Sequence, residues 1–237
     1  MKRIFVPTQG GGDWQRLLAK PGLHWKKGAS AMTAAAAWEA AAGNLPAEIA
    51  GLLASTNEPG LLSLRLLAAI PEWEVALEGG ETASNTDVLA ICRNDEGLCV
   101  VAVEAKVLED FGPRLQEKRH NASSGQVRRL EFLHRLLGVD HFEDSIRYQL
   151  LHRTASALLT AREFHAQVAV MLVHAFGTPV QRKSDFVEFC TAMGATVVVP
   201  GVWKGPASGR ALYLAWCDGQ AKFLEAQLPS MAVGAPA

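Results

Sequence analysis

The sequence lacks the features that mark several common classes of protein. Its four cysteines include no Cys-x-x-Cys pair, which argues against a structural zinc site or a disulfide framework. The N-terminus lacks the longer apolar core and the cleavage signal of a secretory peptide. No run approaches the roughly 18 apolar residues that a membrane-spanning helix needs. We therefore expect a cytoplasmic protein with no membrane segment.

The motifs of several familiar enzymes are also absent. There is no Gly-x-Ser-x-Gly of a serine hydrolase, and the seven histidines show no His-Glu-x-x-His or other paired ligand spacing. The glycine run 10–12 lacks the Lys-Ser/Thr of a phosphate loop, so we interpret it as a turn. The net charge of −1 excludes a polycation, and any contact with nucleic acid must come from a local basic surface.

The composition that remains is that of an ordinary globular protein, 49% hydrophobic and 20% charged over 237 residues. We expect an N-terminal arm at 1–28, one domain at 29–228 and a loose tail at 229–237. Periodicity and breaker residues predict helices at 30–42, 46–54, 61–70, 126–137, 145–164 and 184–193. They predict strands at 72–77, 86–93, 98–107, 168–175, 197–200 and 212–217.

The connections between the predicted strands indicate how they pair. The first three are joined by short turns, which favours an antiparallel meander. The strand at 168–175 is an almost continuous apolar run, which is typical of a central parallel strand. A mixed sheet follows from these two patterns.

Two of these apolar strands carry charge where a buried strand should have none. Asp87 opens one of them, and Glu104 and Lys106 end the next. Because side chains alternate along a strand, Glu104 and Lys106 point to the same face. An unpaired buried charge costs several kcal/mol or more, so these groups need partners, water or a metal ion. The stretch is therefore either a functional site or a structural ion network in which Lys106 neutralises both carboxylates.

Glu39 is the only acidic residue of the alanine-rich helix predicted at 30–42. Its neighbours in the sequence are nearly all apolar, and unpaired carboxylates are rarely buried in such surroundings. Glu39 is therefore a further candidate for the site.

In this order of elements the chain resembles the PD-(D/E)XK nuclease superfamily, which includes many restriction enzymes and recombination exonucleases. The superfamily signature is an Asp on the second core strand and a (D/E)-x-K on the third. Asp87 and Glu104-Ala105-Lys106 match it, although Thr86 replaces the proline before the Asp. The resemblance covers roughly Ser30 to Ala175. It implies an α/β, restriction endonuclease-like fold of three α-β-α layers with a mixed central sheet.

The resemblance also implies a nuclease that uses Mg²⁺ or Mn²⁺ to hydrolyse DNA. Asp87, Glu104 and the Ala105 carbonyl would hold the metal, and Glu39 would add an accessory carboxylate. Hard oxygen ligands of this kind suit such ions. Lys106, on the face of Glu104, would orient the attacking water and stabilise negative charge.

Several choices stay open at this point. Glu78 is a rival to Glu39, and either Gln126 or Gln149 matches the helix glutamine that reaches the site in several branches of the superfamily. The oligomeric state is also open, and a homodimer is one alternative because restriction-type relatives often dimerise. The alternative function is a catalytically inactive module of the same fold that binds nucleic acid or protein. Six basic residues are either phosphate contacts or solvated helix faces: Arg114, Lys118, Arg119, Arg128, Arg129 and Arg135.

Overall fold

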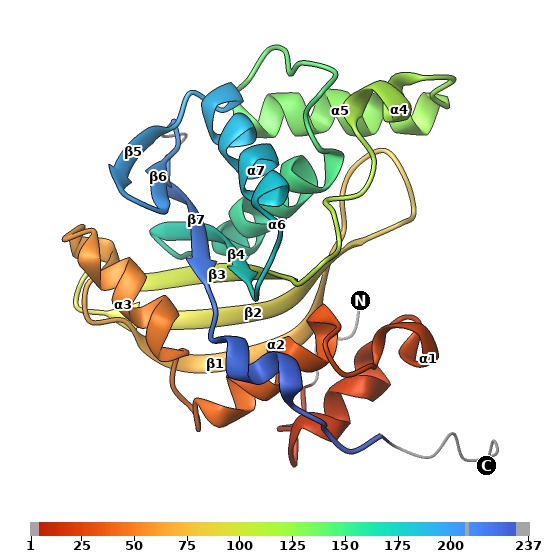
Figure 1. The fold of residues 1–237 in the computed structure, drawn as a ribbon. Helices are drawn as coiled ribbons and strands as arrows, with labels where there is room; N and C mark the ends of the chain where they lie inside the picture. The colour runs from red at the N-terminus through yellow and green to blue at the C-terminus, as the bar shows by residue number, and fades with distance from the viewer. Residues whose placement is uncertain (1–4, 207–208, 231–237) are drawn as a thin grey trace.

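A mixed sheet of seven strands forms the centre of the molecule, with helices on both faces (Figure 1). The computed structural model describes residues 5–206 and 209–230. The predicted α/β fold with three layers and a mixed central sheet is confirmed. The strands are β1 (Arg65–Val75), β2 (Ser84–Asn94), β3 (Gly97–Lys106), β4 (Val168–Ala175), β5 (Thr196–Val199), β6 (Val202–Lys204) and β7 (Ala211–Asp218).

The sheet has the strand order β1-β2-β3-β4-β7-β6-β5. Strands β1 to β3 form the predicted antiparallel meander, and β4 runs parallel to both β3 and β7. Every residue of β4 is buried, as expected for a central parallel strand. The long crossover between β3 and β4 carries three of the four helices that cover one face of the sheet, and the fourth follows β4 (Figure 1).

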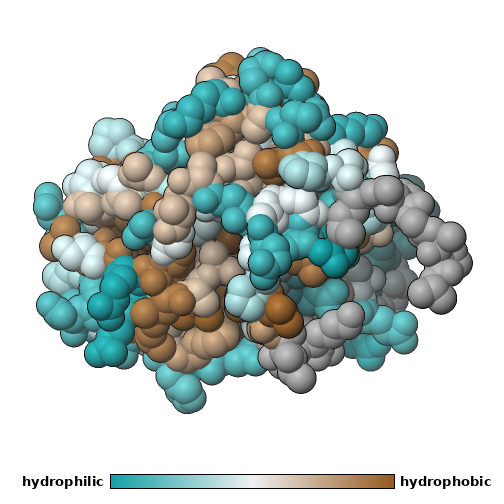
Figure 2. Space-filling view, turned by 90° about the horizontal axis from the view of Figure 1, so that it is seen from below, coloured by the Kyte–Doolittle hydropathy of each residue, from teal (hydrophilic) through white to brown (hydrophobic). Residues whose placement is uncertain are grey.

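The helices divide into two layers. On one face lie α4 (Leu115–Arg119), α5 (Ser124–Leu137), α6 (Tyr148–Glu163) and α7 (Val180–Ala192). On the other lie α1 (Pro21–His24), α2 (Ser30–Ala40) and α3 (Ala47–Ser55), with the short 3-10 turns η1 (Gly11–Leu17), η2 (Pro59–Leu61) and η3 (Ala221–Glu225) completing the chain. Figure 2 views the molecule from below and shows hydrophobic residues exposed among hydrophilic ones on that face.

Alternation along the strands supplies a separate core to each layer. Leu89 and Ala102 pack in the cluster that includes α5 and α6, whereas Val88 and Val103 pack in the cluster that includes α2 and α3. Asp87 is two residues from Leu89, and Glu104 is two residues from Ala102. The side chains of Asp87 and Glu104 are therefore also directed toward α6.

The N-terminal arm packs on the layer that contains α2 and α3. Trp14 and Trp25 are buried in its core, and the Trp25 indole donates to the Pro229 carbonyl at 3.2 Å. Ser230 donates to the Gln15 side chain at 3.3 Å. The start of the predicted loose tail is therefore held against the arm, and residues 231–237 lie outside the described residues.

The helix predicted at 61–70 is wrong, because β1 begins at Arg65 and runs through Pro71. The apolar run has no clear alternation, and Pro71 reads locally as a helix terminator. A proline is tolerated here because β1 is an edge strand and part of its backbone has no partner strand. A register shift between Leu66 and Ala68 and a φ of +52° at Glu72 distort the strand further. The short strand β6 was also not predicted.

Two further expectations concern cysteines and membranes. Cys92 lies opposite Cys99 across the β2–β3 hairpin, and all four cysteines are buried free thiols. Within the described residues, no helix has both the length and the apolar character to cross a bilayer.

Candidate functional site

Strands β2 and β3 part where the charged residues gather. The last backbone pair of their ladder is Val88 with Val103, which places Asp87 beside Glu104. One residue further on, the Ala105 N–H donates to Asp87 Oδ2 at 2.7 Å instead of to a β2 carbonyl. The N–H and C=O of a strand residue face the same neighbouring strand, so the Ala105 carbonyl is also directed toward the strand of Asp87. The carboxylate and this carbonyl are thereby brought together.

Glu104 is the centre of a buried network with α6. Its Oε1 accepts from the Lys106 ammonium at 2.7 Å and from Gln149 Nε2 at 2.8 Å, and its Oε2 accepts from the Arg153 guanidinium. Gln149 Oε1 in turn accepts from Lys106 at 3.1 Å. Glu104 and Lys106 are 4% and 5% exposed, so these bonds have little competition from water.

The backbone and side chain of Lys106 are both fixed. Its carbonyl accepts from the Phe176 N–H at 2.8 Å and from the Thr178 hydroxyl at 2.9 Å. Its ammonium lies 5.2 Å from the centre of the Phe111 ring, at the distance of a cation–π contact. The ammonium is therefore held at one place beside Glu104.

A third carboxylate belongs to the same site. Pro71 pairs with Val88 and Trp73 pairs with Thr86, so Glu72 of β1 lies opposite Asp87 of β2. Asp87 in turn stands at the level of Glu104. Glu72, Asp87 and Glu104 therefore form a row across three adjacent strands.

The charges of this row set the protonation of its members. Burial and then the Glu104 charge raise the pKa of Asp87 to about 7, against the opposing effect of Arg153. Burial and then the Asp87 charge raise the pKa of Glu72 to about 8. Burial also opposes ionisation of Glu104, but Arg153 and Lys106 outweigh it and lower its pKa to about 2. Glu104 is thus firmly ionised, whereas Asp87 and Glu72 repel each other's charge.

The polar side chains around Arg153 connect α6 to the start of β2. Arg153 Nη1 donates to Ser84 Oγ at 2.9 Å, and Ser84 Oγ is hydrogen-bonded to His152 Nδ1 at 2.8 Å. Burial, followed by the Arg153 charge, lowers the pKa of His152 to about 3. His152 is therefore neutral at physiological pH.

The other candidates for the site are placed elsewhere. Glu39 accepts from the Thr8 hydroxyl at 2.8 Å and from the Trp14 indole at 2.7 Å, on the layer opposite α6. Glu78 pairs with Arg135 on the surface, at 3.2 Å. Gln126 accepts from the Ser123 N–H at 2.7 Å and caps α5. Gln149 alone among the open alternatives contacts Glu104 and Lys106.

Most of the six basic residues considered as phosphate contacts interact with other groups of the protein. Arg129 is buried and donates to the carbonyls of the β1–β2 loop, namely those of Leu77, Glu78, Gly80 and Thr82. Arg119 pairs with Asp144, and Arg114 donates to the Ser145 carbonyl. Lys118 lies over the ring of Tyr148. Arg128 is exposed on α5.

The donor set fits a hard divalent cation in the type of its ligand atoms, which are carboxylate and carbonyl oxygens. Asp87 is partly accessible, and the Ala105 carbonyl is directed toward its strand. Within the part of the chain that the structure describes, no three His, Cys, Asp or Glu side chains surround one ion position. Mg²⁺ is usually held by one or two carboxylates and keeps several waters. Asp87 and Glu104 would supply the carboxylates, and Ala105 would add its carbonyl oxygen.

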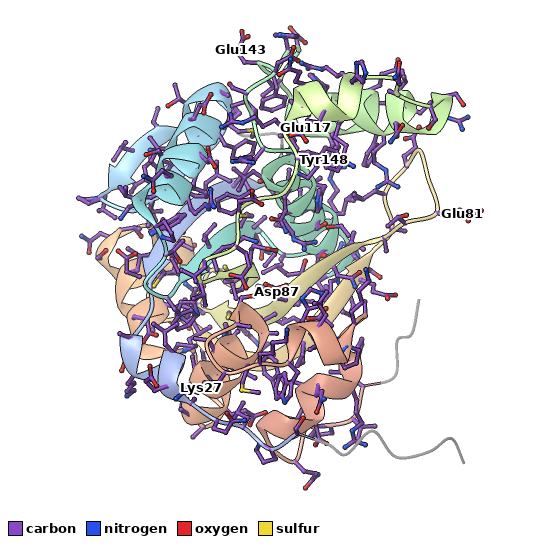
Figure 3. The ribbon with its side chains drawn as sticks, turned by 45° about the vertical axis from the view of Figure 1, so that its right-hand side comes forward. Lys27, Glu81, Asp87, Glu117, Glu143 and Tyr148 are labelled. Carbon is purple, nitrogen blue, oxygen red and sulfur yellow. The ribbon has the colours of Figure 1, made fainter. Side chains whose placement is uncertain are left out.

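Sequence reasoning missed Glu72 and Arg153. Gln149 and Arg153 are four residues apart on one helix, so their shared face is readable from the sequence. Glu72 gave no comparable signal, because its place opposite Asp87 depends on the register of an edge strand. Figure 3 shows Asp87 near the middle of the molecule and Tyr148, next to Gln149, above it at the start of α6.

The chain matches the model of a known family. The profile described as "Domain of unknown function (DUF6946)" matches residues 7–221, which is most of the chain. Neither the curated proteins nor the solved structures gave a significant match.

Proposed function

The chain belongs to the DUF6946 family, and we propose that it is a divalent-metal-dependent nuclease that hydrolyses DNA phosphodiester bonds. The observation that carries this proposal is the convergence of Asp87, Glu104 and Lys106 where β2 and β3 part. An antiparallel meander followed by helices and a parallel strand supports it, because this order is the core of the PD-(D/E)XK superfamily that the sequence resembles.

The residues have distinct roles in the proposed reaction. Asp87, the Ala105 carbonyl and Glu104 would hold the metal, which when bound would lower the pKa of a water and neutralise phosphate charge. Lys106 stabilises the negative charge that develops on the phosphate. Gln149 keeps the Lys106 ammonium in place, and Glu72 adds a further carboxyl group beside Asp87, mostly protonated at neutral pH because its pKa is raised to about 8. In the reaction the water oxygen forms a bond to phosphorus and loses a proton to solvent, the ester bond to the leaving sugar oxygen breaks, and that oxygen takes up a proton from solvent to become a hydroxyl.

Nuclease assays with matched variants test this proposal. The purified protein is expected to cut DNA in Mg²⁺ or Mn²⁺ but not in a chelator. Asp87→Asn and Lys106→Ala should each lower the rate about a hundredfold or more. Glu131→Gln, on the exposed surface of α5, serves as the control and should cut like the wild type. If the folded wild type cuts no nucleic acid with any divalent metal, the enzyme proposal is wrong.

One observation favours the alternative of an inactive binding module. Both oxygens of Glu104 are occupied by Lys106, Gln149 and Arg153, so the network is electrically satisfied at this residue without a metal. Calorimetric titration with Mn²⁺ distinguishes the two functions. Undetectable binding at about millimolar Mn²⁺ would support the module, whereas binding that Asp87→Asn abolishes supports the nuclease.

A further inference from the structure

A small cleft opens beside Lys106, between the β3–α4 connection and the start of α6. Its volume is about 360 Å³, and the residues that matter for its chemistry are Lys106, Phe111, Lys118, Tyr148, Gln149 and His152. Two of these, Lys106 and Gln149, belong to the site described above. Whatever occupies this cleft, which we call the Tyr148 cleft, is therefore adjacent to the proposed reaction centre.

Tyr148 offers an aromatic surface at this position. It is partly exposed, it lies next to Gln149 at the start of α6, and its N–H donates to the Pro113 carbonyl at 3.0 Å. Its ring packs against that of His152, with 5.0 Å between centroids. An aromatic ring next to Gln149, which positions Lys106, suits the stacking of a nucleobase.

Lys118 completes the cleft with a cation that is weakly held. Its ammonium lies 5.1 Å from the centre of the Tyr148 ring. At an exposed site such a contact is weaker than the stacking of a base on an aromatic side chain. A base can therefore displace Lys118 from the ring, and the freed ammonium can pair with a phosphate.

The acidic residue of the cleft does not cancel this charge. Asp110 lies 3.6 Å from Arg147 Nη1 and accepts from the Gly112 N–H at 2.9 Å. Its carboxylate is thus already paired on the side of Arg147. Lys118 is left as the partly exposed cation that faces an incoming phosphate, beside Lys106, whose ammonium is paired with Glu104.

Size and charge together favour a single strand over a duplex. A cleft of about 360 Å³ is at the small end of ligand sites, with room for one nucleotide but not for a base-paired helix. A duplex also needs a broad row of phosphate contacts. Arg119, Arg129 and Arg135 are engaged in bonds within the protein and do not supply such a row.

We propose that the Tyr148 cleft binds one nucleotide of single-stranded nucleic acid, with its base stacked on Tyr148 and a phosphate at Lys118. The substrate class is then a single strand or an unpaired end, and an intact duplex is excluded from the cleft. This inference rests on the proposed nuclease function, because it places the phosphodiester next to Lys106.

Fluorescence anisotropy in a chelator measures binding without cleavage. The probe is a labelled oligonucleotide of about 12 nucleotides, as single-stranded DNA, as RNA of the same sequence and as the DNA duplex. We expect at least one single strand to bind about tenfold or more tightly than the duplex. Equal affinity for the single strands and the duplex would overturn the proposal.

Two pairs of variants locate the contact. Tyr148→Leu should weaken single-strand binding about tenfold, while Tyr148→Phe, which keeps the ring, stays within about twofold of the wild type. Lys118→Ala should reduce the slope of log binding affinity against log salt concentration by about the amount of one phosphate contact. Lys222→Ala, which removes an exposed lysine that lies over Phe223, should not change it. Unchanged binding by Tyr148→Leu, with an unchanged melting temperature, contradicts the cleft.

The outcomes separate this inference from the proposed function. A protein that binds single strands through Tyr148 but cuts none with Mg²⁺ or Mn²⁺ supports the cleft and refutes the nuclease. A protein that cuts DNA but binds duplex and single strand equally supports the nuclease and refutes the cleft.

Discussion

Glu72 of β1 lies opposite Asp87 of β2, and the charge of each carboxylate opposes ionisation of the other. The two are held there by strand pairing rather than by a bond between them. Glu72 has a φ of +52°, which is a strained conformation for a residue other than glycine. The fold thus holds a strained backbone and two carboxyl groups of raised pKa at one point, beside the site proposed for a metal ion.

This relationship predicts how stability changes with pH. The pKa of Glu72 is raised in the folded state from 4.5 to about 8, so the contribution of its proton to stability is fully present below about pH 4.5 and is lost as the pH rises from there to about 8. In metal-free buffer, Glu72→Gln should match the wild type near about pH 5 and exceed its free energy of unfolding by about 2 kcal/mol near about pH 9. Urea unfolding at the two pH values measures the difference. If the free energies of unfolding of the two proteins differed by the same amount at both pH values, the pKa of Glu72 would not be raised in the folded state.

Arg153 competes with a metal ion for Glu104 in the proposed site. Arg153→Met removes one of the two cations that neutralise a buried carboxylate, so the metal-free protein should lose about 2–4 kcal/mol of stability. Mn²⁺ should then raise the melting temperature of the variant more than that of the wild type, because ligand binding stabilises the folded state. Thermal melting with and without Mn²⁺ measures this. An equal effect of Mn²⁺ on both proteins would favour the structural ion network.

Arg129 fixes the loop between β1 and β2. Its guanidinium donates to four loop carbonyls, and the residue is 9% exposed. Arg129→Ala should lower the free energy of unfolding by about 3 kcal/mol, because four carbonyls lose a charged donor. Arg128→Ala, which changes the exposed neighbour on the same helix, should stay within about 0.5 kcal/mol of the wild type. Chemical denaturation compares the two, and similar losses would contradict the assignment.

Gly79 tests the same loop from the other side. A Cβ at Gly79 would lie 2.4 Å from the Arg129 backbone nitrogen, and its φ is +88°. Gly43 has a similar φ of +82° but no atom within 4 Å of a Cβ. Gly43→Ala should therefore cost about 1 kcal/mol for backbone strain alone, and Gly79→Ala about 3 kcal/mol or more. If the two variants had the same melting temperature, the close contact of Gly79 with α5 would add nothing to the loss of stability.

Much of the fold was predictable because its signals are local. The strand at 168–175 was predicted with the bounds it has, since a continuous apolar run between turns leaves few alternatives. The alternation in β2 and β3 correctly predicted that Glu104 and Lys106 share a face. The prediction of a helix at 61–70 failed because an edge strand with a bulge and a proline does not show a regular alternation of apolar and polar residues.

The site was predictable only in part, and for a similar reason. Asp87, Glu104 and Lys106 stand out because charge at the ends of apolar strands is visible in the sequence. The choice of Gln149 over Gln126 required knowing that α6, and not the start of α5, crosses over Glu104. The separation of Glu39 from this network required knowing which face α2 covers.

The sequence by itself therefore determined which residues carry charge into apolar strands, and tertiary structure decided which charges meet. Residue type and period act through neighbours in the chain, so they are readable without a fold. The row of Glu72, Asp87 and Glu104 depends on the register of three strands, and the contacts of Gln149 and Arg153 depend on a helix that lies some 45 residues further along the chain. Such contacts form because packing satisfies buried groups across the whole molecule, and no local pattern specifies them.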